Sequence, residues 1–561
     1  MEGRPGVLEA VEEAARTFES GGMVVFEAPT GYGKTTSTPI LYSRLREKHG
    51  FARIVHALPL RAIVEQATLF FREKLPGARV GFQAGGLTLS GKTPFYGADV
   101  VVSTLDSLAM TVARWSLGEP DRLGHYEVPR AHLFSSMIVL DEAHLPFQPN
   151  PFAPENVEER ASRAATVMAG LAYTFSHFRV PVLVETATLP ASVRAFIAER
   201  YRGPGRVECI VVDEPGASEA SGCRVVEDPD YFETVRSVEW KYGSLDNLDD
   251  AIEKAAEAAE TGERVFLSST TVKAAVKAYE MLAERLGGKV VLVHGRLSAA
   301  DRERAVERLR DAQVLVGTPA VEAGVDYDAD LLLTDVPGAG QGWIAWESLL
   351  QRMGRVARRP MEGRRAEIIF YGEGAGDAEA RMKGVNPRIP STYRHLIDER
   401  RPPRIDAGLL DAFLQAAVHF TPTGALEELR ETLCNPMREA LLTQIVIPEY
   451  EVDPSRGEDL EHVLSRMEAG MTVTTSLHEG VASKAEGGRG WLLERDGKII
   501  VLARGWKSVR GHPGEVEYRL EEVSLYDLAA AAGRCGIIRR NVYLEALIAK
   551  PEAYREGVGL V

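Results

Sequence analysis

The stretch Met23-Val24-Val25-Phe26-Glu27-Ala28-Pro29-Thr30-Gly31-Tyr32-Gly33-Lys34-Thr35 decides the fold of this chain. Its apolar first part predicts a buried strand, its two glycines predict a tightly curled loop, and a helix is expected to follow. Backbone N–H groups of such a loop face a phosphate, and the positive end of the helix dipole points at the same anion. The stretch therefore predicts a strand–loop–helix unit that binds a nucleotide.

The side chains of the loop are expected to hold the phosphates and a metal ion. Lys34 should reach the β- and γ-phosphates and take part in catalysis, and Thr35 should bind Mg²⁺. The alternative is a glycine-rich turn that precedes a helix by chance. The predicted nucleotide-binding residues of this segment are Pro29, Thr30, Gly31, Tyr32, Gly33, Lys34, Thr35 and Thr36.

A second short stretch, Asp141-Glu142-Ala143-His144, follows an apolar run at 137–140. The two carboxylates are therefore expected at the carboxyl end of a parallel strand, which is where ligands bind in open parallel sheets. Asp141 is predicted to hold Mg²⁺, and Glu142 is predicted to polarise the attacking water. Taken alone, the stretch also fits a solvated strand end.

Arginines recur at every third position in a third stretch, which runs from Gln351 to Arg358. The spacing predicts that Arg352, Arg355 and Arg358 share one face of a helix. Arg355 and Arg358 are expected to stabilise charge on the γ-phosphate, so that a cleft closes when ATP bridges two domains. The alternative is a helix with a cationic face toward solvent. Together the three stretches favour a nucleotide-driven motor that acts on nucleic acid.

The size and composition of the chain are those of a globular protein with several domains. At about 150 residues per domain, 561 residues predict three or four domains, and 45% apolar with 26% charged residues argues against disorder. The net charge of -15 argues against binding nucleic acid through bulk charge, but not against a basic channel. Four cysteines without a CxxC pair indicate neither a disulfide framework nor a zinc site. The sequence shows no signal peptide and no membrane-spanning run, so a reducing, cytoplasmic location is expected.

Short runs rich in β-branched residues alternate with amphipathic stretches through the first two thirds of the chain. Such runs are typical of buried strands in a parallel sheet. The predicted fold class is therefore α/β, with two tandem parallel-sheet domains, a helical connector and a small C-terminal accessory domain. The expected bounds are 1–212 and 213–375 for the sheet domains, 376–470 for the connector and 471–561 for the accessory domain.

The order of these stretches resembles the superfamily 2 helicases of the DEAH-box type. The resemblance implies that both sheet domains are RecA-like and that Asp326 and Gln351 contact the nucleotide. It also implies strand contacts by Arg61, Thr104, Ser268 and Thr318, although strand-end residues that bind loop backbone are the alternative for these four. The blocks similar to motifs Ia, Ic, III, IV and V are 57–66, 102–106, 186–188, 267–270 and 316–326.

Within this superfamily, the chain is similar to the helicase part of the type I CRISPR-associated nuclease-helicase. The similarity lies in Leu140-Asp141-Glu142-Ala143-His144 and in segment 325–330 followed directly by segment 348–355. It implies ATP and Mg²⁺ as cofactors and 3′-to-5′ translocation on single-stranded DNA. It also implies that an RNA-guided CRISPR surveillance complex is a partner, whose R-loop supplies the displaced strand.

Two departures from the family pattern change what is expected. Many members begin with a histidine–aspartate nuclease domain, whereas Arg4-Pro5 stands almost at the start here and none of the 12 histidines is followed by Asp. We therefore expect no nuclease activity in this chain and a separate histidine–aspartate nuclease subunit as partner. Many relatives also read adenine through a Gln soon after an Arg-Pro pair, where this chain has Val7, so its selectivity for ATP is in question.

Two other functions fit parts of the same pattern. A general RNA-remodelling helicase would share the core motifs, because these motifs grip the phosphate backbone and barely report the sugar. A non-catalytic adaptor with a decayed ATPase core is the second alternative, against which the intact motifs argue. Trp343 and Trp346 could stack on a base or pack between helices, and His294 could face a strand or be an ordinary loop histidine.

Overall fold

The computed structural model of this chain describes all but a set of short segments. Those segments are 1–2, 60, 85–89, 94, 115–126, 149–161, 202–205, 218–221, 319–326, 360, 420–441, 477–489, 507–515, 534–536, 540–541 and 561. The described residues fall into two compact units. The larger unit holds those between 3 and 290 and between 311 and 419, and the smaller holds 291–310 and those from 442 onward.

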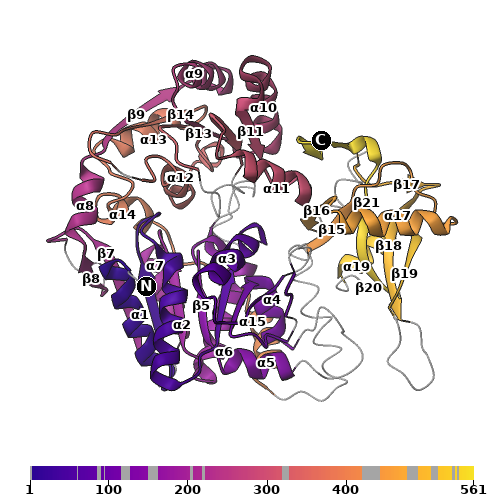
Figure 1. Cartoon of the computed structure of the whole chain (residues 1–561), viewed down its shortest axis with the longest axis horizontal. Coiled ribbons are helices and arrows are strands. Elements are labelled where there is room, and N and C mark those ends of the chain that lie inside the picture. The colour runs from indigo at the N-terminus through magenta and orange to yellow at the C-terminus, as the bar shows by residue number, and fades with distance from the viewer. Residues whose placement is uncertain are drawn as a thin grey trace. The chain divides into compact units, whose positions relative to one another are not determined.

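An eight-stranded parallel sheet begins the larger unit, with the strand order β3-β4-β2-β5-β6-β1-β7-β8 (Figure 1). Its strands are β1 (Met23–Glu27), β2 (Ile54–Leu58), β3 (Val80–Gln83), β4 (Val100–Thr104), β5 (Met137–Leu140), β6 (Val182–Thr186), β7 (Val207–Asp213) and β8 (Arg224–Glu227). Its helices are α1 (Pro5–Thr17), α2 (Ser37–His49), α3 (Arg61–Lys74), α4 (Leu105–Val112), α5 (Glu127–Phe134), α6 (Arg163–His177) and α7 (Ala191–Arg200). Two 3₁₀ turns, η1 (Lys34–Thr36) and η2 (Leu145–Phe147), follow β1 and β5.

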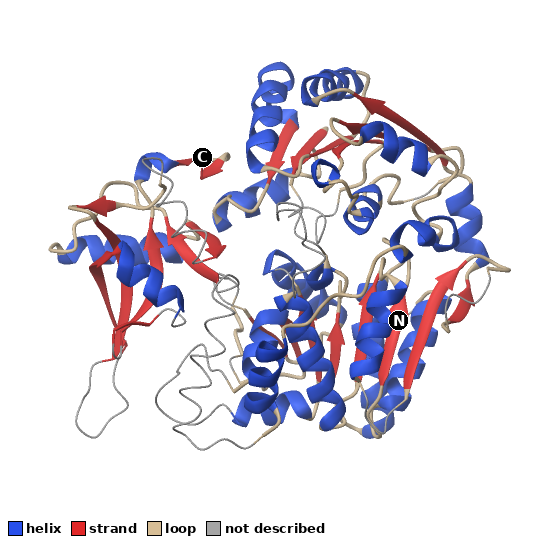
Figure 2. Ribbon diagram, turned by 180° about the vertical axis from the view of Figure 1, so that it is seen from behind, coloured by secondary structure: helices blue, strands red, loops and turns tan. Residues whose placement is uncertain are grey.

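The central strands of this sheet are buried along their whole length, as their apolar runs predict. Every residue of β1, β2, β4, β5 and β6 is buried. Helices pack on both faces of a parallel sheet, and Figure 2 shows the red strands of this sheet with blue helices beside them. The carboxyl ends of β1, β5 and β6 therefore meet at one edge, where the two predicted nucleotide stretches begin.

A second sheet follows, with the strand order β11-β12-β10-β13-β14-β9. Its strands are β9 (Glu239–Leu245), β10 (Val265–Ser268), β11 (Val290–Val293), β12 (Val314–Gly317), β13 (Leu331–Asp335) and β14 (Arg365–Tyr371). The helices along this part of the chain are α8 (Pro229–Arg236), α9 (Leu248–Glu260), α10 (Val272–Leu286), α12 (Trp346–Met353), α13 (Ala375–Met382), α14 (Pro390–Asp398) and α15 (Ala407–Ala417). The chain then returns to the first domain, since α15 packs on α6 where Gly170 leaves room for the Phe413 ring.

The smaller unit is built on a seven-stranded sheet with two apolar cores. Its elements are α11 (Ala299–Arg308), β15 (Leu442–Val446), α17 (Gly457–Glu468), β16 (Thr472–Ser476), β17 (Glu494–Arg495), β18 (Lys498–Trp506), β19 (Val516–Ser524), α19 (Leu525–Gly533), β20 (Ile537–Arg539) and β21 (Val542–Ile548). A short hairpin of β22 (Tyr554–Arg555) and β23 (Gly559–Leu560) ends it.

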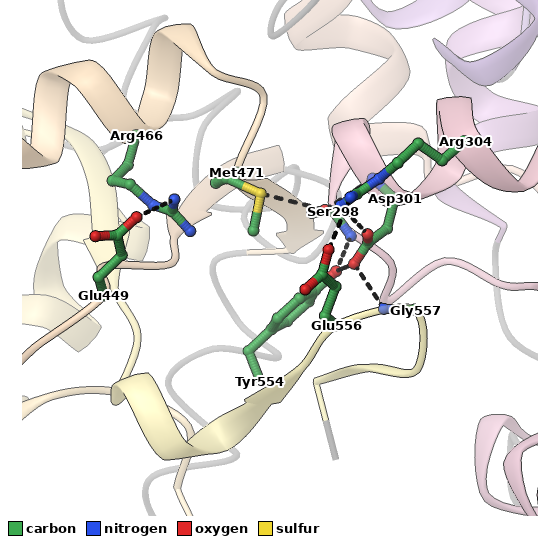
Figure 3. Close-up of polar contacts among 9 residues, drawn as sticks. All are labelled: Ser298, Asp301, Arg304, Glu449, Arg466, Met471, Tyr554, Glu556 and Gly557. Atoms are coloured by element: carbon green, nitrogen blue, oxygen red, sulfur yellow. Dashed lines mark hydrogen bonds and ion pairs between the residues drawn. The ribbon is translucent and has the colours of Figure 1, made fainter.

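The last residues of the smaller unit close onto the start of α11 (Figure 3). The Tyr554 hydroxyl donates to the Asp301 carboxylate and accepts from the Ser298 backbone N–H at 2.9 Å. The Gly557 backbone N–H donates to the same Asp301 oxygen at 3.0 Å. The Asp301 side chain therefore anchors the chain end to the start of α11.

The structure confirms the predicted fold class and differs from the expected bounds at two points. β8, at 224–227, pairs with β7 and extends the first sheet beyond residue 212. β15, at 442–446, pairs with β16, so the accessory domain begins before residue 471. The sequence showed neither, because both strands are short and take their place through pairing with other strands rather than through a local signal.

The expectation of no disulfide is wrong, because Cys209 and Cys223 are bonded to each other. Cys209 lies in β7 and Cys223 directly precedes β8, so the pairing of the two strands brings the sulfurs together. A spacing of 14 residues carries no local signature of this kind. Cys434 and Cys535 lie outside the described residues.

Candidate nucleotide site

The loop after β1 has the curled backbone that a phosphate cradle requires. Gly31 has φ +82° and Gly33 has φ +102°, values that side-chain-bearing residues rarely adopt. The turn η1 follows, so α2 begins at Ser37, one turn later than the loop sequence alone suggested. Thr35 is exposed in this turn, which leaves it open to a metal ion at the loop.

The Lys34 side chain turns back onto its own loop. Its Nζ donates to the Ala28 carbonyl at 2.9 Å and to the Pro29 carbonyl at 3.3 Å. Burial lowers the pKa of Lys34, and the charges of Glu142 and Asp141 oppose that shift. The ammonium is therefore held by two neutral acceptors at the mouth of the loop, where an anion would be a stronger partner.

Asp141 and Glu142 lie where β5 ends, as predicted. Glu142 takes a left-handed backbone conformation (φ +51°), and its N–H donates to Asp141 Oδ1 at 2.8 Å. Burial acts to raise the pKa of Asp141, but hydrogen bonding to His56 and the charges of His56 and Lys34 bring it below its usual value. Asp141 is thus an ionised oxygen donor, the kind of ligand that Mg²⁺ prefers.

The Glu142 carboxylate is suited to accept a proton. Burial, and then the charge of Asp141, raise its pKa above the usual range for glutamate. Its Oε2 is buried and accepts no hydrogen bond, and His144 Nδ1 lies 3.6 Å from it. A buried, unpartnered carboxylate oxygen of raised basicity is what activation of a water molecule requires.

His144, which closes this stretch, is neutral. Burial lowers the pKa of His144 to about 3, and the charge of Lys34 acts in the same direction. Its Nδ1 lies 3.1 Å from the Thr186 hydroxyl, which ties the end of β5 to the end of β6. The imidazole therefore links two strands of the site rather than supplying a charge.

The predicted helical face of arginines is wrong. α12 ends at Met353, so Arg355 and Arg358 lie in the turn beyond it, and only Arg352 remains on the helix. Arg352 is fully buried, and its Nη1 donates to Asp335 Oδ1 at 2.8 Å. The backbone after α12 pairs with residue 329 as an isolated β-bridge, which overrides the helical spacing.

Arg355 and Arg358 nevertheless lie near the Glu142 carboxylate. The positive charges of both act to lower the pKa of Glu142, and that of Arg358 also lowers the pKa of Lys34. The structure thus brings together the loop lysine, the carboxylate pair and the two arginines, although the arginines follow the carboxylates by more than 200 residues in the sequence.

Gln351 connects the second sheet domain to two loops of the first. Its Nε2 donates to the Thr188 hydroxyl at 3.3 Å, and the Thr30 hydroxyl donates to its Oε1 at 3.4 Å. Gly354 lies against the same loop, since a Cβ at this position would be 2.7 Å from the Thr30 Cβ. Residues 30, 188 and 351 therefore form one contact at the predicted nucleotide position.

Arg388 is a site residue that the sequence reasoning missed. Its guanidinium is buried and donates to the carbonyls of Thr30 (3.2 Å), Gly354 (3.1 Å) and Val356 (3.2 Å). It thereby holds the phosphate loop to the turn that carries Arg355. Its local sequence, Asn386-Pro387-Arg388, has no motif that could have pointed to this role.

Both sheet domains match helicase families. Residues 9–196 match the DEAD/DEAH box helicase family, and residues 261–361 match the C-terminal family of the CRISPR-associated nuclease/helicase Cas3. The chain carries a DEAD/DEAH box helicase domain followed by a Cas3-like C-terminal domain. The helicase core thus covers the whole of the site described above, apart from Arg388.

Known proteins of similar sequence and structure agree with these matches. The chain is 28% identical over 399 residues to the CRISPR-associated helicase Cas3 of Thermoproteus tenax, covering 67% of this chain and 60% of that protein. The crystal structures of T. fusca Cas3 and of its ATP complex each superpose with a TM-score of 0.56, at 16% and 15% identity. The superposed regions cover 89% and 88% of this chain and 66% and 65% of the two T. fusca chains. They show that this chain shares their fold.

Val7 stands at the position where the family pattern has a Gln. Val7 is fully buried in the core, and the Gly6 N–H donates to the Tyr32 hydroxyl at 3.1 Å. Tyr32 in turn donates to Asp228 Oδ2 at 2.8 Å, at the start of α8. The loop tyrosine is therefore fixed to the segment that enters the second domain, and selectivity for adenine stays in question.

The predicted strand contacts differ in their surroundings. Thr104 caps α4, because its hydroxyl accepts from the Ser107 N–H at 3.2 Å, which is the alternative role considered above. Ser268 and Thr318 are both buried at the ends of β10 and β12. The Arg61 side chain and Asp326 lie outside the described residues. A strand-binding role for these positions stays a prediction.

The C-terminal segment of the same chain contacts the turn at His294. His294 Nε2 lies 2.8 Å from the Val558 carbonyl, and Nδ1 accepts from the Arg296 N–H at 3.1 Å. Burial lowers the pKa of His294 to about 4, so the ring is neutral.

Trp346 is buried with the Arg381 guanidinium over its ring, so this side chain packs within the protein rather than being open to stack on a base. Among the described residues, no helix is long and apolar enough to cross a membrane.

Proposed function

We propose that this protein is an ATP-dependent translocase on single-stranded DNA that unwinds target DNA in type I CRISPR interference. The observation that carries the proposal is the convergence of Lys34, Glu142, Arg355 and Arg358 on one site in a Cas3-like helicase core. The matched helicase of Thermoproteus tenax is named for a CRISPR system. Because the chain spans 60% of that relative, its substrate and partners are part of the proposal.

Each residue of the site has its own role in the hydrolysis of ATP. Lys34 leaves the carbonyls of its own loop and binds the β- and γ-phosphates, because a charged acceptor replaces neutral ones. Glu142 Oε2 accepts a proton from the attacking water. Arg355 and Arg358 stabilise the charge that develops on the γ-phosphate. Bound Mg²⁺ supplies charge neutralisation there.

The chain has the oxygen donors that Mg²⁺ needs. Thr35 is exposed beside the loop and Asp141 is ionised at the end of β5, so these two residues would hold the ion. The unpartnered Glu142 oxygen supports a ligand at this place, because buried polar atoms seldom lack a partner. The ribose contact of Asp326 remains part of the proposal.

Domain motion follows from where the two domains touch. Gln351, Arg388 and Gly354 contact the phosphate loop from the second domain, so any change at the γ-phosphate alters these contacts first. Hydrolysis would then release the turn that carries Arg355 and Arg358, which converts chemistry into relative motion. The direction of that motion along DNA is proposed to be 3′ to 5′.

We further propose that cleavage of the DNA is supplied by a separate histidine–aspartate nuclease, and that an RNA-guided surveillance complex delivers the strand. No histidine of this chain is followed by an aspartate. Among the described residues, the one set of three or more His, Cys, Asp or Glu side chains close enough for a metal is Glu27, Cys209 and Cys223, which contains no histidine. Two of those three are joined in the disulfide.

RNA remodelling is the second candidate function. A match of 36% identity to the ATP-dependent RNA helicase DBP5 of Mycosarcoma maydis covers 81 residues, or 14% of this chain. The shared core does not distinguish the two sugars, because its contacts are to the phosphate backbone. The choice of DNA rests on the longer match to the CRISPR-associated helicase.

Strand displacement on tailed duplexes tests this proposal. The protein should release the shorter strand from a duplex with a 3′ single-stranded DNA tail in the presence of ATP and Mg²⁺. A 5′ tail, or Lys34→Ala, should abolish release. Displacement from the 5′ tail would contradict the polarity, and metal-dependent cutting of single-stranded DNA by the purified chain would contradict the separate nuclease. A Lys34→Ala variant with full function would instead support a non-catalytic adaptor.

A further inference from the structure

A third carboxylate lies beside the pair at the end of β5. Glu185 belongs to β6, whose parallel register pairs Leu140 with Val184. Asp141 and Glu185 directly follow this last pair, so the two carboxylates lie at the same edge of the sheet. The Ala143 N–H donates to the Glu185 carbonyl at 3.1 Å, which fixes the two strand ends to each other.

Glu185 is fully buried and has acceptor capacity that its neighbours do not fill. The buried Ser37 hydroxyl at the start of α2 lies within hydrogen-bonding reach of the Glu185 carboxylate, but one hydroxyl can donate to only one of its two oxygens. The other oxygen has no hydrogen-bond partner among the described residues. A buried carboxylate oxygen without a partner indicates that a further donor is bound there in the working protein.

The surroundings of Glu185 favour a cation with its water shell. Two further carboxylates, those of Asp141 and Glu142, lie close enough to Glu185 to interact with it electrostatically. Among the described residues, the ligand atoms of Asp141, Glu142 and Glu185 do not form a set within 4.8 Å of one another. The three carboxylates are thus too far apart to grip one ion directly.

We propose that Glu185 and Ser37 form an outer shell for Mg²⁺, in which the Glu185 carboxylate accepts a hydrogen bond from a water bound to the ion. Mg²⁺ gives up its waters reluctantly and is commonly held through one or two protein oxygens, with the rest of its shell hydrated. Groups that bind those waters fix the position of the ion. This inference rests on the proposed Mg²⁺ site at Thr35 and Asp141. Glu185 is a positioning residue in this account and does not touch the nucleotide.

The test is the dependence of nucleotide binding on Mg²⁺. A fluorescent ATP analogue that cannot be hydrolysed is titrated onto the full chain at a series of MgCl₂ concentrations. Glu185→Gln keeps the size of the side chain but weakens its acceptor, so the half-saturating Mg²⁺ concentration should rise about 10-fold. Binding of the analogue without Mg²⁺ should not change. The matched control is Glu208→Gln, on β7 opposite Val24 and away from the loop.

The outcomes separate the possible failures. If wild type binds the analogue in a Mg²⁺-dependent way and Glu185→Gln has the same Mg²⁺ midpoint, Glu185 is a buried structural group and the inference is overturned. If wild type itself shows no Mg²⁺-dependent binding, the proposed function fails and this inference fails with it. Ser37→Ala probes the same shell from α2 and should shift the Mg²⁺ midpoint in the same direction, which keeps the test decisive if Glu185→Gln does not fold.

Discussion

Replacing Arg388 with methionine should loosen the nucleotide site and slow ATP hydrolysis. Its guanidinium is the donor for three carbonyls, those of Thr30, Gly354 and Val356. Methionine keeps much of the side-chain length but leaves these carbonyls without that donor. Hydrogen bonds to a charged group contribute roughly 1.5–3 kcal/mol each, and bonds that share one group are not additive. We expect a loss of about 3 kcal/mol in the free energy of unfolding.

That loss has a measurable size. For domains of 150–250 residues, roughly 2–4 °C of melting temperature corresponds to 1 kcal/mol, so the nucleotide-free protein should melt about 6–12 °C lower. Because Thr30 and the turn after α12 are no longer held together, kcat for ATP should also fall by a factor of about 10 or more. Arg388→Lys should recover only part of both losses. It restores the positive charge, but one ammonium cannot reach three carbonyls as the planar guanidinium does.

The assay is differential scanning fluorimetry together with steady-state ATP hydrolysis. Arg365→Met is the matched control, because Arg365 is exposed and pairs with the exposed Glu239. It should leave kcat near the wild-type value. The reasoning is refuted if Arg388→Met melts and hydrolyses ATP as wild type does.

Three further perturbations test other parts of the account. Gly354→Ala places a Cβ 2.7 Å from the Thr30 Cβ, about 0.7 Å closer than ordinary contact. It should lower the free energy of unfolding by about 1–3 kcal/mol and also lower kcat. Gly376→Ala, which has open space around it, should change neither. Burial lowers the pKa of His144 from its ordinary 6.5 to about 3 in the folded protein, so below pH 6.5 the unfolded state binds a proton that the folded state does not. The stability is therefore fully present above pH 6.5 and falls as the pH drops below it. Unfolding by urea at pH 6 and pH 5 should show wild type losing roughly 1 kcal/mol more than His144→Asn, and equal losses would contradict the buried neutral ring. Reduction of the Cys209–Cys223 bond, which closes a loop of 14 residues, should cost about 3 kcal/mol, so dithiothreitol should lower the melting temperature of wild type but not of Cys223→Ser.

The strands and the phosphate loop could be predicted because their signals are local. An apolar run with β-branched residues has to be buried on both faces, and Gly31 and Gly33 supply the backbone angles that the loop needs. Asp141 and Glu142 could be placed for the same reason, since a residue that directly follows a buried strand lies at the edge of the sheet. These elements needed no knowledge of distant parts of the chain.

The rest of the site depends on contacts between distant segments. The spacing of Arg352, Arg355 and Arg358 is helical, but pairing of Val356 with Ala329 draws the segment out of the helix. Local spacing reports propensity, and tertiary pairing overrides it. The Cys209–Cys223 bond could not be predicted for a related reason, because it follows from the pairing of β7 with β8.

Arg388 carries no local signature, and Glu185 carries only a partial one. Arg388 follows a proline in a segment without a motif, and its role appears only when its three carbonyl partners are seen together. Glu185 interrupts an apolar strand, which is a signal that a buried charge has a purpose. That signal could have been read from the sequence, but the position of its neighbours could not.

The central claim is that this chain is a motor driven by ATP and engaged by single-stranded DNA. The most direct measurement is steady-state ATP hydrolysis by the purified chain without polynucleotide, with single-stranded DNA and with single-stranded RNA, with Lys34→Ala as the control. The account predicts strong stimulation by DNA, little by RNA and none in the variant. Stimulation by RNA in preference to DNA would contradict the assigned substrate, and hydrolysis that persists in Lys34→Ala would contradict the site itself.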